Sequence, residues 1–201
     1  MSHYVIFVPG IGDDVKGIQS ALVNSWSLYG VSGITHELPW MDTEPFAPKL
    51  QRLLGRIDGL RAEGHIVSLV GVSAGAGAVI NAFAQRPRDI HGVVCIVGKI
   101  NNPDAIGDGY RRRSPSFLES AMQVQFSLDA LDEQDEGLRQ RIMSRYALLD
   151  LIVPREDSVL LGGINKTVWS IGHATTILQQ LSIGAPRYIG WLKSLQSQDK
   201  E

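Results

Sequence analysis

The residue pattern with the clearest chemical meaning is Gly71-x-Ser73-x-Gly75, which lies between two runs of different character. The apolar run 66–70 predicts a buried strand, and the small-residue run 74–84 predicts a helix. A serine at such a strand-to-helix turn is held in a strained backbone conformation, with its hydroxyl exposed at the end of the sheet. The flanking glycines remove side chains that would block so tight a crossing. The pattern therefore indicates a nucleophilic serine.

Two other interpretations compete for the same residues. Ser73 could simply cap a small-residue helix that packs closely on a strand. The glycine spacing also matches the nucleotide loop of the short-chain dehydrogenases. That family, however, has this loop after its first strand and a later Tyr-x-x-x-Lys pair, whereas Tyr188 and Lys193 have a different spacing. No Walker-type Gly-Lys-Ser/Thr motif is present either.

The segment 66–84 resembles the nucleophile elbow of the α/β-hydrolase superfamily. The resemblance extends over essentially the whole chain and implies a small, trimmed serine hydrolase or esterase. It also implies a catalytic triad in the chain order serine, acid, histidine, with each member at the carboxyl end of a strand. The base and the acid are therefore expected after Ser73 in the chain.

The resemblance implies that His173 is the base and Asp150 the acid. His173 is the only histidine in the second half of the chain, and it follows the last predicted strand. Asp150 closes the fifth predicted strand and begins a segment, 150–154, that resembles the superfamily's recurring Asp-x-x-Val-Pro. Its role would be to accept the other imidazole N–H and to fix the tautomer. Asp157 is the rival acid, although it falls in a polar turn.

An acyl transfer also needs two N–H donors aimed at the developing oxyanion. One donor is expected from Ala74, at the start of a helix whose dipole favours negative charge. The other is expected from the loop after the first strand, at Ile11 or Gly12. In the superfamily this loop commonly begins His-Gly, whereas this chain has Pro9-Gly10. The departure affects the geometry of the loop more than the chemistry, because the donors are backbone amides.

The elements that must position these residues alternate along the chain. We expect strands over 4–8, 34–38, 66–70, 91–97, 143–149 and 166–170. We expect helices over 14–27, 45–62, 74–84, 174–180 and 186–196. This alternation predicts the α/β class, with a mainly parallel six-stranded sheet and helices on both faces. Because the first strand already leads to the oxyanion loop, the resemblance implies a fold without the superfamily's first two antiparallel strands.

The regular spacing breaks over 101–145, where no clear strand is visible. Turn-rich sequence at the start precedes two expected helices, 116–122 and 128–142. An irregular insertion of this length is usually functional or mobile. In the superfamily the segment at this position often forms a cap over the active site. The plainer interpretation is the outer helix of the sheet with a long lead-in, and both interpretations stay open.

The bulk composition is that of an ordinary globular protein, and we expect one domain over 1–201. The hydrophobic residues make up 44% of the chain and the net charge is −2, which gives no indication of nucleic-acid binding. The single cysteine, Cys95, lies in an apolar run and is expected to be a buried thiol. No intrachain disulfide is possible, and we expect a cytoplasmic protein. No apolar stretch approaches membrane-spanning length, and the oligomeric state is not readable.

These features predict a serine hydrolase that acts on a small-molecule ester or thioester. Ser73 would attack, His173 would carry the proton and Asp150 would orient the imidazole. This chemistry implies no metal and no organic cofactor. The alternative is a catalytically inactive α/β-hydrolase-like binding protein, because a fold alone does not determine a function.

Overall fold

The computed structural model describes residues 1–12 and 16–198, and its centre is a six-stranded sheet. The strands are β1 (His3–Val8), β2 (Ser32–Thr35), β3 (Ile66–Val72), β4 (Ile90–Ile96), β5 (Ile142–Leu149) and β6 (Ile164–Ile171). They follow the spatial order β2-β1-β3-β4-β5-β6, and every neighbouring pair is parallel. The predicted α/β class with six strands is confirmed, and the described sheet is parallel throughout.

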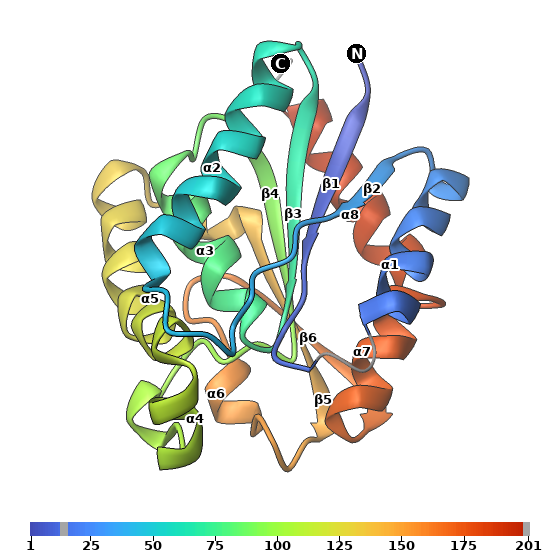
Figure 1. Cartoon of the computed structure of the whole chain (residues 1–201). Coiled ribbons are helices and arrows are strands. Elements are labelled where there is room, and N and C mark those ends of the chain that lie inside the picture. Colours follow the sequence, from blue (N-terminus) through green and yellow to red (C-terminus); the bar gives the residue numbers. More distant parts are fainter. Residues whose placement is uncertain (13–15, 199–201) are drawn as a thin grey trace.

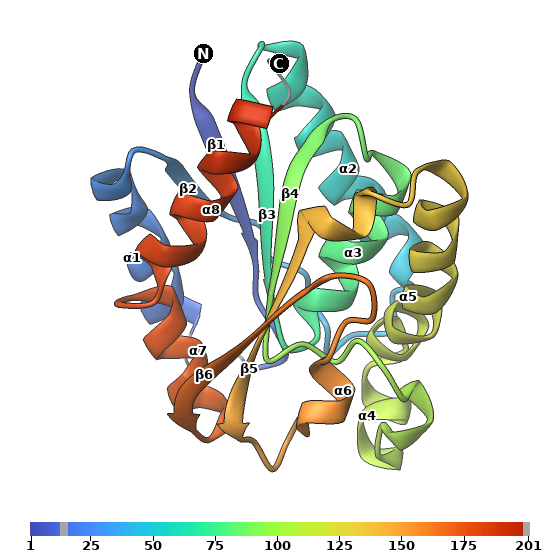
Figure 2. The same ribbon diagram turned by 180° about the vertical axis from the view of Figure 1, so that it is seen from behind.

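Two layers of helices enclose this sheet, as Figures 1 and 2 show from opposite sides. One face is covered by α1 (Lys16–Asn24), α7 (His173–Leu181) and α8 (Ala185–Gln198). The other face is covered by α2 (Phe46–Ala62), α3 (Gly75–Gln85) and α5 (Pro115–Gln134). The short helices α4 (Asp108–Arg113) and α6 (Arg155–Ser158) lie at the carboxyl end of the sheet. Short 3-10 helices cover Ser25–Tyr29, Pro103–Ala105 and Leu138–Arg141.

The strands β1, β3 and β4 are largely apolar on both faces because each contributes to both layers of the core. In β1, Val5 and Phe7 pack into the core beneath α8, whereas Ile6 and Val8 pack into the core beneath α2 and α3. Successive side chains of a strand point to opposite faces, so a strand covered on both sides must be apolar throughout. The continuous apolar runs of the sequence follow from this arrangement.

The order of the strands creates a crevice between the ends of β1 and β3. The chain passes from β1 outward to the edge strand β2, then returns to β3 on the other side of β1. The connections after β1 and β3 therefore leave the sheet in opposite directions. In open parallel sheets, ligands bind at this topological switch point, outside the carboxyl ends of the strands.

The bounds predicted for the second strand were wrong. We expected 34–38, whereas β2 covers Ser32–Thr35 and pairs with Tyr4–Phe7 of β1. Leu38 is fully buried in the core, but it reaches that position from an irregular segment. An apolar side chain reports burial, and burial alone does not require strand backbone.

The two helices predicted over 116–122 and 128–142 were also wrong. The first is part of the 20-residue α5, which continues to Gln134, and a 3-10 turn then leads directly into β5. Val124 lies between the two predicted helices and is buried with Leu128 and Leu131 on the same side. No glycine or proline interrupts the sequence there, so the helix continues through the interval.

The first helix was expected over 14–27, and Asp14 lies outside the described residues. Within the described part, α1 starts at Lys16 and is followed by the 3-10 helix Ser25–Tyr29, which Gly30 ends in a left-handed conformation with φ of 76°. None of the helices in the described ranges has the length and apolar character needed to cross a bilayer.

Candidate active site

Ser73 lies at the junction of β3 and α3, in the conformation that the sequence pattern predicts for it. Its φ of 51° is in the left-handed region, which non-glycine residues rarely adopt. Such a conformation costs about 1–3 kcal/mol and persists only where the surroundings hold it. Here the Ser73 N–H donates to the Ile96 carbonyl at 3.0 Å, and the Ser73 carbonyl accepts from Ala76 N at 3.2 Å.

The glycines around Ser73 are required by close backbone contacts. A Cβ on Gly71 would overlap the carbonyl of Gly75, and a Cβ on Gly75 would overlap the carbonyl of Val8. Backbone atoms cannot rotate away as a flexible side chain can. A third glycine, Gly10, comes from the loop after β1, and a Cβ there would lie 2.8 Å from the Cβ of Ser73. The loop after β1 and the turn after β3 are therefore in direct contact.

The interpretation of Ser73 as a helix cap is wrong. The N-cap residue of α3 is Ala74, and this helix has no side-chain cap hydrogen bond. Among residues 1–12 and 16–198, the Ser73 hydroxyl has no hydrogen-bond partner at all. The side chain instead lines a cavity, which leaves its oxygen available to a ligand.

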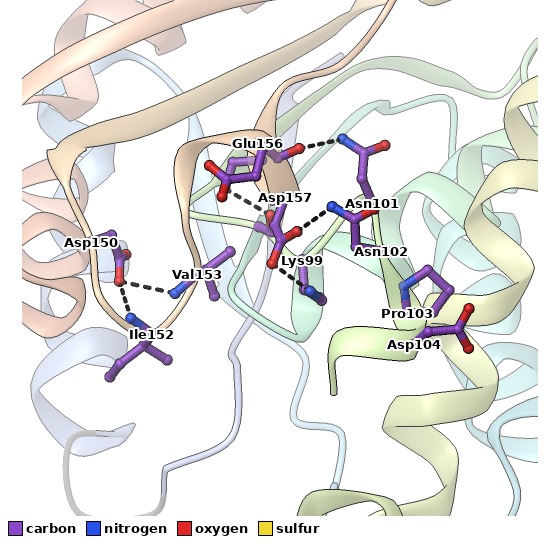
Figure 3. Close-up of polar contacts among 12 residues, drawn as sticks. Lys99, Asn101, Asn102, Pro103, Asp104, Asp150, Ile152, Val153, Glu156 and Asp157 are labelled. Atoms are coloured by element: carbon purple, nitrogen blue, oxygen red, sulfur yellow. Dashed lines mark hydrogen bonds and ion pairs between the residues drawn. The ribbon is translucent and has the colours of Figure 1, made fainter. Parts of the chain in front are cut away.

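Asp150 and His173 form a hydrogen-bonded pair at the carboxyl ends of β5 and β6. His173 Nδ1 lies 2.7 Å from Asp150 Oδ2, and the side chains are 10% and 2% exposed. The other carboxylate oxygen, Oδ1, accepts the N–H groups of Ile152 at 2.8 Å and Val153 at 3.0 Å (Figure 3). Because an ionised carboxylate only accepts, Nδ1 must carry the proton of a neutral imidazole. His173 Nε2 is then left as an acceptor.

Ser73 and His173 line the same small cavity at the switch point of the sheet. Its volume is about 90 Å³, and its walls come from the loop after β1, the turn after β3 and the start of α7. In the part of the chain that the structure describes, no hydrogen bond joins the Ser73 hydroxyl to the imidazole. Hydrogen bonds between catalytic groups are often long without substrate and tighten when it binds. The three predicted triad residues thus meet at one edge of the sheet.

Of the two segments predicted to hold the oxyanion donors, the loop after β1 lines this cavity, and Ala74 is the residue next to Ser73. Ile11 and Gly12 line it, and Gly12 has a φ of 147° that favours glycine. The loop is fixed from behind, because Trp40 Nε1 donates to the Pro9 carbonyl at 3.0 Å. Ala74 follows Ser73 directly and is buried at the start of α3. The geometry therefore brings both predicted donor segments to the serine.

Comparison with solved structures finds other proteins with this fold. Est1E from Butyrivibrio proteoclasticus superposes with a TM-score of 0.69 at 14% identity, covering 96% of this chain and 89% of that one. A structure from the work on LipS and LipT, two metagenome-derived lipolytic enzymes, gives 0.64 at 13% identity, with 96% and 94% covered. MGS-MChE2, an α/β-hydrolase enzyme from a lagoon-sediment metagenome, gives 0.62 at 14% identity, with 96% and 92% covered.

The chain has the α/β-hydrolase fold. The match to solved structures is one of shape, because all three identities lie below 25%. No protein-family model and no curated protein matches the sequence. In this fold, Ser73 lies in the turn that joins β3 to α3.

The rival acid, Asp157, is engaged elsewhere in this α/β-hydrolase fold. Its carboxylate pairs with Lys99 through Oδ2 and accepts Asn102 Nδ2 at 2.7 Å through Oδ1 (Figure 3). Within the described residues it makes no hydrogen bond to His173, so Asp150 and not this rival is the imidazole's partner. Sequence reasoning missed Lys99. The available signal was a charged residue directly after an apolar strand, at the sheet edge where ligands bind.

A larger cleft of about 410 Å³ opens beside Ser73 and His173. Besides Ser73 and His173, its walls come from three parts of the chain: the loop after β1, the segment from the end of β4 to the start of α5, and the segment after β5. The lining residues are Ile11, Ser73, Lys99, Ala105, Ile106, Gly107, Tyr110, Phe117, Leu151, Ile152, Val153, Pro154, Asp157 and His173. The segment 101–145 therefore agrees in part with each of its two interpretations, the cap and the outer helix. Residues of its first part, through α4, line the cleft together with Phe117 at the start of α5, whereas the rest of α5 is an outer helix on the sheet.

Metal ligands and Cys95 are the other groups that could take part in chemistry. Across residues 1–12 and 16–198, no three His, Cys, Asp or Glu side chains gather in a way that would hold a metal ion. Cys95 is fully buried, and burial raises the pKa of its thiol well above the ordinary value. A thiol that stays protonated and enclosed is a poor nucleophile. Ser73, which lines a cavity, is therefore better placed than Cys95 to act as a nucleophile.

Proposed function

We propose that this chain is a serine hydrolase that cleaves an ester or thioester through an acyl-enzyme intermediate. The single observation that carries the proposal is the 2.7 Å hydrogen bond between His173 Nδ1 and Asp150 Oδ2, beside a serine in the left-handed conformation. A nucleophile, a base and an orienting acid are the three groups that serine catalysis needs. The solved hydrolases of the same fold support the same class of reaction.

In the acylation step, Ser73 Oγ attacks the carbonyl carbon of the substrate and gives its proton to His173 Nε2. The imidazolium that forms is stabilised by the Asp150 carboxylate, which keeps its negative charge. When the tetrahedral intermediate collapses, the bond to the leaving oxygen or sulfur breaks and the leaving group takes the proton from Nε2. A water molecule then attacks the acyl carbonyl carbon and gives a proton to His173 Nε2. The bond to Ser73 Oγ breaks, Oγ takes that proton, and the carboxylic acid is released. Every step uses groups of this chain and water.

The oxyanion of each tetrahedral intermediate would accept two backbone N–H groups. We assign the first to Ala74, and the second to Ile11 or Gly12 in the loop after β1. Ile11 and Gly12 line the 90 Å³ cavity with Ser73, and the dipole of α3 favours negative charge beside Ala74. One such donor contributes about 100- to 1,000-fold to kcat in serine hydrolases.

The cleft beside the serine suits a small acyl substrate. Apolar side chains such as Ile106, Phe117 and Val153 form much of its lining and suit an acyl chain. A cleft of 410 Å³ lies within the usual range of small-molecule sites, which is about 300–1,000 Å³. The substrate we propose is therefore a small-molecule ester or thioester.

Fluorophosphonate labelling tests the proposal, because this reagent bonds covalently to an activated serine. We expect labelling of the wild-type chain and turnover of p-nitrophenyl butyrate. Ser73→Ala should lose both while the circular dichroism spectrum stays unchanged. Ser194→Ala is the matched control, since Ser194 is exposed on α8 and its hydroxyl donates to the Trp191 carbonyl. Equal labelling of the Ser73→Ala chain would refute the assignment.

A non-catalytic binding protein is the second candidate, and one observation favours it. The described residues contain no hydrogen bond between the Ser73 hydroxyl and His173. If the base cannot approach the serine, the wild-type chain will resist labelling even at high reagent concentration. That result would support binding without chemistry.

A further inference from the structure

Lys99 and Asp157 form a buried ion pair that the triad does not use. Lys99 Nζ donates to Asp157 Oδ2, and each side chain is only 7% exposed. Both residues line the 410 Å³ cleft together with Ser73 and His173. Figure 3 shows the pair between the turn after β5 and the segment that follows β4. Burying two charges has an unfavourable desolvation free energy that their attraction offsets only in part, so this pair is a poor candidate for a purely stabilising contact.

The carboxylate of this pair has both of its oxygens occupied. Oδ2 accepts from Lys99, and Oδ1 accepts from Asn102 Nδ2 at 2.7 Å. The backbone of the same residue is also held, because its carbonyl accepts the N–H groups of Ile100 at 2.8 Å and Asn101 at 2.9 Å. Asp157 is therefore a fixed support.

The ammonium group of Lys99, by contrast, has hydrogen-bond donors without a partner among the described residues. It has three N–H donors, and within residues 1–12 and 16–198 its one hydrogen-bond partner is Asp157. Its other two N–H donors have no partner among these residues, and Lys99 is one of the residues that line the cleft. A buried donor without a partner costs about 1–3 kcal/mol, so a ligand oxygen that meets it gains affinity.

The position of Lys99 relates these donors to the reacting atoms. The Lys99 backbone N–H donates to the Ser73 carbonyl at 3.3 Å, so the two residues are in direct contact through their main chains. Both side chains reach the same cleft. A substrate whose carbonyl carbon lies at the serine can therefore extend its acyl chain towards the ammonium group.

We propose that Lys99 determines specificity by binding a neutral oxygen on the acyl part of the substrate, such as an ether, hydroxyl or keto oxygen. This inference rests on the proposed function. A carboxylate on the substrate is disfavoured, because Asp157 already neutralises the ammonium group. A plain alkyl chain would leave the two N–H donors unpaired. The preferred substrate is thus an oxygen-bearing acyl ester or thioester.

Two p-nitrophenyl esters of equal size test this preference. The 3-methoxypropanoate ester has an ether oxygen where the pentanoate ester has a methylene group. Each kcat/KM is divided by the rate constant for hydroxide hydrolysis of the same ester, which removes the difference in intrinsic reactivity. A hydrogen bond to a charged donor contributes about 1.5–3 kcal/mol, so the corrected ratio should favour the ether by about 10- to 100-fold.

Lys99→Met removes the donors and keeps the length of the side chain, and it should reduce the corrected ratio to about one. Because this change leaves Asp157 buried without its partner, the paired variant Lys99→Met/Asp157→Leu provides a second measurement that removes both charges. Its ratio should also be about one. The matched control is Lys166→Met on the exposed part of β6, which should keep the wild-type ratio.

Hydrolysis of both esters by the wild type without a preference would overturn the inference alone. A preference that survives in the paired variant would overturn it equally. If the wild type hydrolyses neither ester and fluorophosphonate does not label Ser73, the serine-hydrolase proposal has failed, and the inference fails with it.

Discussion

Asp150→Asn is the substitution whose effect the geometry specifies most fully. In the wild type, Oδ2 of Asp150 accepts the N–H of His173, and Oδ1 accepts the N–H groups of Ile152 and Val153. An asparagine has one carbonyl oxygen and one NH₂ group. The two backbone N–H groups require an acceptor, so the carbonyl oxygen stays with them. The NH₂ group must then face His173.

This arrangement changes the tautomer of the imidazole. Nδ1 of His173 now meets a donor, so it becomes the acceptor and the proton moves to Nε2. Nε2, the nitrogen that we propose as the base, can then no longer take a proton from the Ser73 hydroxyl. The equivalent change in serine proteases lowers kcat by about 10⁴-fold, which corresponds to about 5.4 kcal/mol of transition-state stabilisation.

The assay is steady-state hydrolysis of p-nitrophenyl butyrate at neutral pH. We expect kcat to fall by about 10⁴-fold while KM changes little, because Asp150 does not touch the substrate. The matched control is Asp132→Asn, since Asp132 is exposed at the end of α5 and pairs with Arg139 at 2.7 Å. It should keep wild-type kinetics. An Asp150→Asn chain that retains more than a tenth of the wild-type kcat would refute the reasoning.

Three further predictions concern the fold that holds the site. Gly75→Ala should lower the free energy of unfolding in urea by about 1–3 kcal/mol, because its Cβ overlaps the Val8 carbonyl. Gly59→Ala on α2, where the new Cβ meets open space, should instead raise it by about 0.4–1 kcal/mol; equal effects would contradict the packing argument. Cys95 should resist iodoacetamide in the native chain and react in urea, and rapid native alkylation would contradict its burial. Burial, with His91 and Lys193 nearby, lowers the pKa of His3 to about 4, so the unfolded chain binds more protons between pH 6.5 and 4. The free energy of unfolding should therefore fall as the pH is lowered through that range, and His3→Gln should reduce the slope; an unchanged slope would exclude this cause.

The elbow was predictable from the sequence because its cause is local. A serine in the left-handed conformation needs small neighbours, and the contacts of Gly71 and Gly75 show why those two positions carry no side chain. Asp150 and His173 could also be predicted, because each of them follows a predicted strand. In a parallel sheet, the residues that follow each strand meet at one edge.

The ion pair of Lys99 and Asp157 lay beyond sequence reasoning because its partners are 58 residues apart. Nothing in either local segment indicates the other, and the pairing depends on how the turn after β5 meets the end of β4. The bounds of β2 were missed for a different reason. Leu38 has the apolar character of a strand residue, yet it enters the core from an irregular segment.

The continuity of α5 was missed because polar and apolar residues alternate unevenly between Met122 and Leu128. The helix is stabilised there by its packing against α3, where Asn81 Nδ2 donates to the Ser120 carbonyl at 3.0 Å and Ser127 donates to Asn81 Oδ1 at 2.8 Å. These contacts join residues from two helices far apart in sequence. The hydrophobic periodicity of one helix contains no information about such contacts with another helix.

Acid-quench mass spectrometry of the reacting chain would detect the proposed acyl-enzyme intermediate itself. The chain is mixed with p-nitrophenyl butyrate, stopped in acid within the first turnover, digested and mapped. We expect a butyryl group on the Ser73 side chain, and no such group in the Ser73→Ala chain. Release of p-nitrophenol with the butyryl group on another residue, or with no covalent intermediate, would contradict the proposal.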